Sequence, residues 1–358
     1  MIRPREARRY SGNTMEMTFR WFGETDPIPL SNVRQIPGVT GVVSALYDVA
    51  VGEAWSRDGL DRLAQHVNDA GLHLAVIESV PVHEDIKLGR PNRDHYIENY
   101  AESIRRIGEA GVTVLCYNFM PVFDWMRTDL ALRLEDGSTA LAYDDDDLKR
   151  IDLSKGTGDL PGWGAAYDAR TLAALLDAYR AVNEERLWEN LAYFLEAVVP
   201  VAESVGVRMA IHPDDPPWRI FGLPRIITNA AAFDRLVKIV DSPANGITFC
   251  TGSLGADPGN DLPAMARRFS KAGRINFVHA RNVKVTGPHQ FHETPHPGKF
   301  GDVDMRSVLG ALRGGGFDGP MRPDHGRMIW DEKGRPGYGL YDRALGATYL
   351  QGLWEGLG

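Results

Sequence analysis

Residues 207–212 read Val-Arg-Met-Ala-Ile-His, an apolar run that begins directly after Gly206 and ends in a histidine. A long segment of helical period precedes it, and we expect this helix to span Leu172–Val205 with a break near Pro200. Glycine directly after the last periodic residue is typical of a helix end, because glycine adopts the left-handed conformation there without strain. The stretch therefore predicts one helix followed by one buried strand.

The same alternation of helix and strand continues in both directions along the chain. Short apolar runs separated by helical segments are typical of a parallel sheet. An open sheet would normally stop at about five or six strands and carry a glycine-rich phosphate loop, and neither GxGxxG nor a Walker sequence is present. The fold class is therefore predicted as α/β, a (β/α)8 TIM barrel. The eight predicted strands are Thr18–Phe22, Gly41–Tyr47, Leu72–Glu78, Val112–Phe119, Val207–His212, Gly246–Thr251, Ile275–His279 and Pro320–Asp324.

The domain organisation follows from the same pattern. We expect residues 15–358 to form one catalytic barrel domain, preceded by a polar leader at 1–14 that has four arginines among its first ten residues. Residues 121–170 interrupt the alternation after strand four and are predicted to form a lid-like insertion. It contains an apparent hairpin around Asp136-Gly137 and an acidic run at 144–147, which we expect to be a solvated face.

Composition and charge exclude several classes of protein. The chain has 358 residues, of which 43% are hydrophobic and 25% charged, so a large core is available. Acidic residues exceed basic ones by 8, which argues against a nucleic-acid partner. No apolar run reaches the length of about 18 residues that a membrane span needs, and no secretory signal is evident. Two cysteines are too few for a disulfide scaffold. We therefore expect a cytoplasmic protein without a membrane partner.

Four consecutive predicted strands end in residues that can bind metal ions. These are His212, Cys250, His279 and Asp324, spaced 38, 29 and 45 positions apart, about one βα unit each. Barrel enzymes place their chemistry at these strand ends. Each residue alone could be structural, but together they predict a metal site. Mixed nitrogen, sulfur and oxygen ligands suit Mn, Fe, Co or Zn, and the need for open coordination positions favours Mn(II) or Fe(II).

Several long strings in the sequence closely resemble the mannonate dehydratase family, from about Met15 to the C-terminus. The resemblance implies a barrel related to xylose isomerase that converts D-mannonate to 2-keto-3-deoxy-D-gluconate and water, in hexuronate catabolism, with Mn(II) or Fe(II). It implies that the four strand-end residues are the metal ligands. The strings are Arg20-Trp-Phe-Gly23, residues 34–46, Glu78-Ser-Val-Pro-Val-His83, residues 116–125, Ile211-His-Pro-Asp-Asp-Pro-Pro-Trp218 and Pro323-Asp-His-Gly326.

The resemblance also implies that His325 and Tyr338 are catalytic. Our hypothesis is that His325 protonates the leaving C3 hydroxyl and that Tyr338 takes part in proton transfer at C2. The two roles could be reversed. Exchange of C2 hydrogen for deuterium in the single variants decides between them.

Other polar residues near the strand ends are candidates for substrate binding. Arg281 and Asn282 could hold the carboxylate and hydroxyls of a sugar acid, although a salt bridge across the barrel mouth is the alternative for Arg281. Asn118 and His83 could contact hydroxyl groups or serve structural roles. Cys116 is most simply a core residue. Residues 289–296 contain His289, His292 and His296 together with Glu293. We expect this segment to form a lid or a subunit contact rather than a second metal site.

Three other functions remain open. A metal-dependent sugar isomerase or epimerase would use a similar barrel without losing water. A DNA endonuclease of related shape would need a basic surface, which the net charge of −8 disfavours. A sugar-acid binding protein would need no acid or base. By analogy with other barrels we expect a homo-oligomer.

Overall fold

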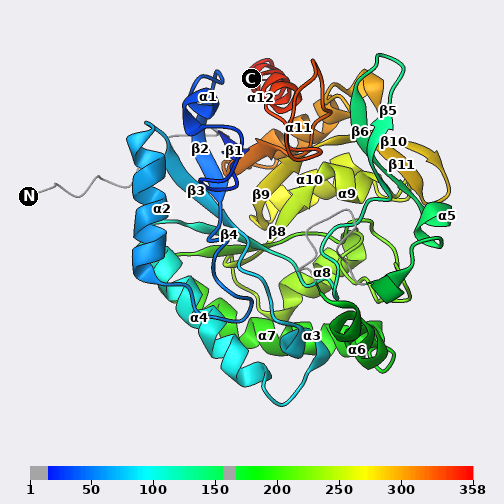
Figure 1. Cartoon of the computed structure of the whole chain (residues 1–358). Coiled ribbons are helices and arrows are strands. Elements are labelled where there is room, and N and C mark those ends of the chain that lie inside the picture. The colour runs from blue at the N-terminus through cyan, green and yellow to red at the C-terminus, as the bar shows by residue number, and fades with distance from the viewer. Residues whose placement is uncertain (1–14, 156–166, 358) are drawn as a thin grey trace, which may run out of the picture.

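The computed structural model describes residues 15–155 and 167–357 (Figure 1). The predicted leader at 1–14 and residues 156–166 of the predicted lid-like insertion lie outside these described residues. Within them, no helix combines the length and the apolar character needed to cross a membrane.

Eight parallel strands close into a barrel in the order β1-β12-β9-β8-β7-β4-β3-β2, which confirms the predicted fold class. Each predicted strand is present with ends shifted by a few residues. A strand in such a barrel is buried on both faces, which explains why it reads as a continuous apolar run. The strands are β1 (Glu16–Arg20), β2 (Val39–Ser44), β3 (His73–Glu78), β4 (Val114–Tyr117), β7 (Arg208–Ile211), β8 (Asn245–Cys250), β9 (Ile275–Ala280) and β12 (Pro320–Pro323).

Helices cover the outside of the barrel and ring it in Figure 1. The long ones follow their strands, as the βα pattern requires. The helices are α1 (Leu30–Arg34), α2 (Arg57–Asp69), α3 (Glu84–Leu88), α4 (Arg93–Glu109), α5 (Asp145–Leu148), α6 (Ala169–Tyr179), α7 (Glu184–Ser204), α8 (Ala230–Ile239), α9 (Thr251–Gly255), α10 (Leu262–Lys271), α11 (Met305–Gly314) and α12 (Tyr341–Glu355), with single 3-10 turns at Leu153–Lys155 and Gly298–Phe300.

The hydrophobic core has two parts, because successive side chains of a strand point to opposite faces. One large cluster lies between the strands and the surrounding helices. A small cluster of buried residues groups alternate side chains of the strands: Val43, Val76, Val114, Cys116, Ala210 and Phe277. Cys116 belongs to this small cluster, in agreement with the expected core position.

The expected break near Pro200 is wrong. Residues 169–204 form two helices, and Pro200 lies inside the second, α7. The first helix ends at Tyr179, and α7 begins after Asn183, whose side chain accepts a hydrogen bond from the Arg186 N–H over 2.8 Å. A buried apolar stripe on α7 packs against the barrel, and this packing outweighs the hydrogen bond that proline removes.

A second sheet of four antiparallel strands lies beside the barrel, at the right of Figure 1. Its order is β10-β11-β6-β5, with β5 (Asp129–Arg133), β6 (Thr139–Asp144), β10 (Asn282–Gly287) and β11 (Gln290–Thr294). The hairpin predicted around Asp136-Gly137 is present as β5 and β6. Residues 282–294, for which no strand was predicted, form a hairpin, and β11 pairs with β6 across a long sequence separation.

Candidate active site

Four polar side chains stand at the carboxyl ends of neighbouring barrel strands. His212 follows β7, Cys250 ends β8, His279 is the last residue but one of β9, and Asp324 follows β12. The strand register places Cys250 beside His279. Because the strands of a barrel present their carboxyl ends at one face, all four side chains reach the same mouth.

The potential ligand atoms of these residues lie close together. His212 Nε2 is 3.1 Å from His279 Nδ1. Asp324 places Oδ2 at 3.6 Å from Cys250 Sγ and Oδ1 at 3.7 Å from His279 Nδ1. The ligand atoms of the two histidines and the cysteine all fall within 4.8 Å of one another. The structure thus brings together the four residues that the strand ends nominated.

Electrostatics favour positive charge at this cluster: they stabilise the thiolate of Cys250 and the protonated form of His212, whose proton a bound cation would replace. Burial alone would raise the pKa of Cys250, but the Arg281 guanidinium and a hydrogen bond from His212 bring it well below the usual range. Ser253 also donates its hydroxyl to Cys250 Sγ over 3.0 Å. Burial alone would lower the pKa of His212, whereas contact with Cys250 and the charge of Asp324 raise it to about 9. The cluster attracts positive charge, and its donor atoms fit a transition metal.

Glu78 is a further acidic residue at this mouth that the sequence reasoning missed. It ends β3, and both of its carboxylate oxygens accept from Arg322, at 2.9 and 3.1 Å. Its Oε2 is 3.3 Å from His279 Nε2. Burial opposes ionisation, but Arg322 and His279 bring the pKa of Glu78 well below its usual range. The strand-end rule applied to the third predicted strand would have found it.

Tyr338, His325 and Glu293 form a row of hydrogen-bonded side chains beside the four residues. Tyr338 Oη is 2.9 Å from His325 Nε2, and His325 Nδ1 is 2.7 Å from Glu293 Oε1. The ring of Phe22 packs edge-on against Tyr338. Burial and the charge of Asp324 raise the pKa of Tyr338 above its usual range, so the phenol is protonated at neutral pH. The two residues predicted to be catalytic therefore touch each other.

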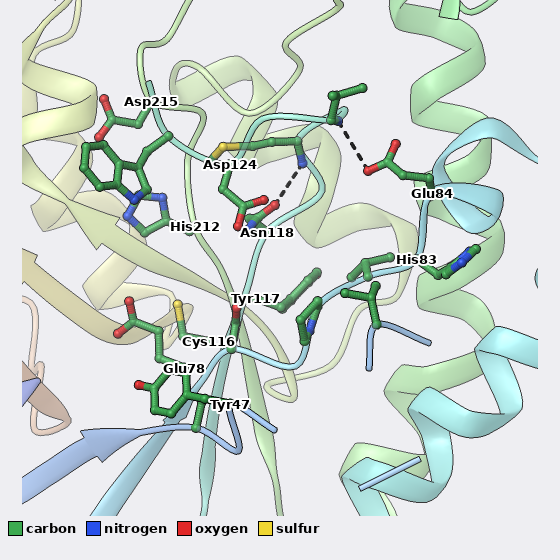
Figure 2. A pocket seen from close by; sticks show the side chains of 18 of the residues that line it. Tyr47, Glu78, His83, Glu84, Cys116, Tyr117, Asn118, Asp124, His212 and Asp215 are labelled. Atoms are coloured by element: carbon green, nitrogen blue, oxygen red, sulfur yellow. Dashed lines mark hydrogen bonds between the residues drawn. The ribbon is translucent and has the colours of Figure 1, made fainter. Parts of the chain in front are cut away.

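A cavity of about 900 Å³ opens at this mouth, lined by His212, Asp324, His325 and Tyr338 among others. Figure 2 shows its breadth: His212 and Glu78 stand on one side, and His83 and Glu84 on the opposite side. This volume accommodates a six-carbon sugar acid.

Asn118 and His83, two predicted substrate contacts, line this cavity. Asn118 Oδ1 accepts from the Met120 N–H over 3.1 Å, and the Asn118 side chain also forms a hydrogen bond with Asp124. His83 caps α3 by accepting from the Asp85 N–H over 3.1 Å, and its ring stacks on Tyr96. Both have structural contacts, and their binding of substrate stays a prediction.

The other two predicted substrate contacts, Arg281 and Asn282, are buried and do not line the cavity. The Arg281 guanidinium is engaged by Asp215 at 2.9 Å and by Asp324 at 3.2 Å, in addition to Glu293. This is the salt bridge across the barrel mouth that the sequence left as an alternative. Asn282 donates to the Pro297 carbonyl and accepts from the Val303 N–H. Burial of these side chains is invisible in the local sequence.

The histidines at 289–296 are dispersed. His289 stacks on Trp218 with ring centroids 4.4 Å apart, and His296 is buried against Gly346. His292 contacts the backbone carbonyl of Glu293. Among the residues that the structure describes, none of these histidines joins a cluster suited to a metal ion.

Solved structures with the same barrel include "L-ribulose 3-epimerase", with a TM-score of 0.52 and 14% identity over 96% of each chain. At this identity the likeness concerns the fold. A much closer match is "mannonate dehydratase from Streptococcus suis serotype2", with a TM-score of 0.90 and 51% identity over 96% of this chain and 95% of that one.

Sequence comparisons point the same way. "Mannonate dehydratase 2" of Halalkalibacterium halodurans is 57% identical over 341 residues, which cover 95% of this chain and 99% of the relative. "Mannonate dehydratase" of Thermotoga petrophila is 56% identical over 354 residues, covering 96% and 98%. The family model described as D-mannonate dehydratase (UxuA) matches residues 15–358. The chain therefore belongs to the D-mannonate dehydratase family.

Proposed function

We propose that this protein is a hydro-lyase that removes water from D-mannonate and yields 2-keto-3-deoxy-D-gluconate. The observation that carries the proposal is the meeting, in one cavity, of His212 and Asp324 of the four-residue cluster with the hydrogen-bonded pair Tyr338 and His325. Family membership supplies the substrate. A dehydration of this kind needs a charge stabiliser, a base for C2 and an acid for the C3 hydroxyl, and the cavity offers all three.

We infer that His212, Cys250, His279 and Asp324 hold Mn(II) or Fe(II). Four protein ligands leave positions for substrate oxygens only in five- or six-fold coordination, which suits these ions better than a tetrahedral zinc site. When bound, the cation would supply positive charge that stabilises the enediolate-like charge developing beside the substrate carboxylate.

Proton removal at C2 falls to Tyr338. Because its phenol is protonated at neutral pH, it acts as a base after passing its proton to His325 Nε2, which lies 2.9 Å away. Tyr338 Oη then takes the C2 proton, and the electron pair of the C2–H bond moves toward the carboxylate.

Loss of the hydroxyl falls to His325. Its Nε2 donates the proton received from Tyr338 to the C3 hydroxyl, the C3–O bond breaks with its electron pair, and water leaves. The double bond forms between C2 and C3, and the resulting enol becomes the 2-keto product. Tyr338 now holds the former C2 proton and His325 is neutral, so the pair has returned to its starting state.

Two arginines line the cavity close to this pair. Arg20 and Arg335 line the cavity, and their guanidinium groups lie 5.0 and 4.3 Å from the centre of the Phe22 ring. Phe22 in turn contacts Tyr338. We propose these arginines for the predicted carboxylate contact in place of Arg281, because they line the cavity and Arg281 does not. Arg20 is also 3.6 Å from Glu78 Oε2.

We also propose that the chain forms homo-oligomers. Support comes from an exposed apolar group at the start of α12, where Trp330 is 70% exposed and contacts the half-exposed Tyr341, with Leu345 one turn further. Exposed aromatic side chains gathered in this way are typical of contact surfaces between subunits.

The proposal is tested by incubating the purified protein with D-mannonate under Mn(II) and under anaerobic Fe(II), with elemental analysis of the same preparation. We expect a 2-keto-3-deoxy acid in both cases, its loss after chelation and its return on adding back the ion. D-Gluconate, which differs at C2, is the matched control substrate. A ketose or an epimer formed without loss of water would contradict the proposal and favour an isomerase or epimerase.

A further inference from the structure

Glu293 is a buried carboxylate of the antiparallel sheet to which the reaction above gives no role. It lies in β11 and is 1% exposed. Its Oε1 receives three side chains at once: His325 Nδ1 at 2.7 Å, Arg281 Nη1 at 2.5 Å and Arg127 Nη2 at 2.9 Å. A carboxylate with these neighbours is held in place by contacts that do not depend on substrate.

The ionisation state of the Glu293 carboxylate decides which ring nitrogen of His325 carries a hydrogen. Burial opposes ionisation, but the charges of His325, Arg281 and Arg127 lower the pKa of Glu293 to about 2. An ionised carboxylate only accepts hydrogen bonds, so the hydrogen between the two groups belongs to His325 Nδ1. In the neutral ring, Nε2 is then an acceptor, and it faces the hydroxyl of Tyr338.

We propose that Glu293 is a positioning residue for the dehydration, which orients His325 and fixes its Nδ1–H tautomer so that Nε2 can accept the proton of Tyr338. The inference rests on the proposed function. Without this carboxylate, the ring could carry its hydrogen on Nε2 or rotate, and the hand-over from Tyr338 would be blocked. Carboxylates that hold the far nitrogen of a catalytic or metal-binding imidazole act in the same way in other proteins.

A closed ring of charges holds Glu293 itself. Arg127 binds Asp215 through two hydrogen bonds, at 2.9 and 3.0 Å, and Arg281 binds the same carboxylate at 2.9 Å. Two guanidinium groups and two carboxylates thus alternate and balance in charge, as buried ions require. Both arginines bind Oε1, the oxygen that also contacts His325, and Arg281 Nη1 lies 3.1 Å from His325 Nδ1, so contacts within the protein hold the imidazole in place.

The antiparallel sheet gains a function from this arrangement. Glu293 pairs with Val283 of β10, and the neighbouring His292 pairs with Ala142 of β6. Arg127 precedes β5 in the same sheet. The sheet therefore delivers both the carboxylate and one of its arginine partners to the barrel mouth, where His325 follows β12.

The first test compares Glu293→Gln and Glu293→Asp with the wild-type holoenzyme in the D-mannonate assay. We expect Glu293→Gln to lower kcat by about 100-fold or more with KM changed by less than about threefold, because substrate does not touch Glu293. Glu293→Asp keeps the charge and should recover about tenfold of that loss. His292→Ala, on the same strand, is the matched control and should keep kcat within about threefold.

Several outcomes would overturn the inference. These are a Glu293→Gln enzyme with nearly wild-type kcat, a loss confined to KM, or a Glu293→Asp enzyme no better than the glutamine variant. A wild-type protein that does not dehydrate D-mannonate would instead refute the proposed function.

Neutron diffraction of the wild-type holoenzyme, exchanged into D2O, tests the hydrogen bond without any substitution and without turnover. We expect deuterium on His325 Nδ1, between the ring and Glu293 Oε1. Deuterium on Nε2 alone would overturn the inference even if the variants failed to fold.

Discussion

His325 and Tyr338 share a hydrogen bond of 2.9 Å, so their roles cannot be separated by distance alone. Their order in the proton transfer can be separated by experiment. If Tyr338 is the base at C2, Tyr338→Phe should slow both dehydration and exchange of the C2 hydrogen with D2O by about 100-fold or more.

His325→Asn provides the comparison for this prediction. It removes both the acceptor of the Tyr338 proton and the acid for the C3 hydroxyl, so dehydration and C2 exchange should both fall by about 100-fold or more. Exchange is measured by proton NMR of D-mannonate in D2O. Normal exchange by Tyr338→Phe would show that the assignment of the base is wrong.

Some site residues can be predicted from the sequence and others cannot. His212, Cys250, His279 and Asp324 were found because each stands at a strand end, where the direction of the barrel decides its position. Arg281 follows the same pattern but faces Asp215 and Glu293, which lie 66 and 12 positions away in the chain. Such distant partners leave no trace in the local sequence, so its burial could not be predicted.

Helix α7 begins at a side-chain cap. Its first turn depends on the Asn183 side chain, which accepts from the Arg186 N–H. Asn183→Ala should lower the free energy of unfolding by about 1 kcal/mol, because that N–H loses its partner. Urea denaturation followed by circular dichroism measures the change.

Asn183→Asp is the control for the same position, since aspartate is an equally good cap. The free energy of unfolding of this variant should stay close to that of the wild-type protein. Equal stability of the alanine and wild-type proteins would contradict the importance of this cap and leave the packing of α7 as the reason for its start.

The elements differ in how well the sequence predicts them. Barrel strands are buried on both faces and end beside glycine-terminated helices, so local patterns identified all eight. Strands β10 and β11 were missed, because Gly287 and the prolines around the hairpin read as a loop. Their stability comes from the pairing of Phe291 with Tyr143, a contact between two distant parts of the chain.

Buried acidic side chains predict how the whole molecule responds to acid. Glu293, Glu78 and Asp215 all have pKa values held below their usual range by neighbouring arginines and histidines, against the effect of burial. Groups of this kind stabilise the fold at any pH above the pKa that they have in the unfolded chain, about 4. They lose that contribution as the pH falls toward their lower pKa in the folded protein.

We therefore expect the urea midpoint to stay nearly constant from about pH 7 to about pH 5 and then to fall steadily toward about pH 2. About 0.5 M sodium chloride should change the profile little, because buried pairs are weakly screened. A midpoint that stays level down to about pH 3 would contradict the prediction, and one that falls only at low salt would point to surface charges instead.

The shared edge between β6 and β11 links two hairpins, residues 129–144 and 282–294, that lie far apart in the sequence. Neither hairpin can be shortened, transplanted or replaced alone without leaving the other with an open edge. Loop exchange between barrels of this kind must therefore move residues 129–144 and 282–294 together, and natural changes in length at one hairpin should be accompanied by changes at the other.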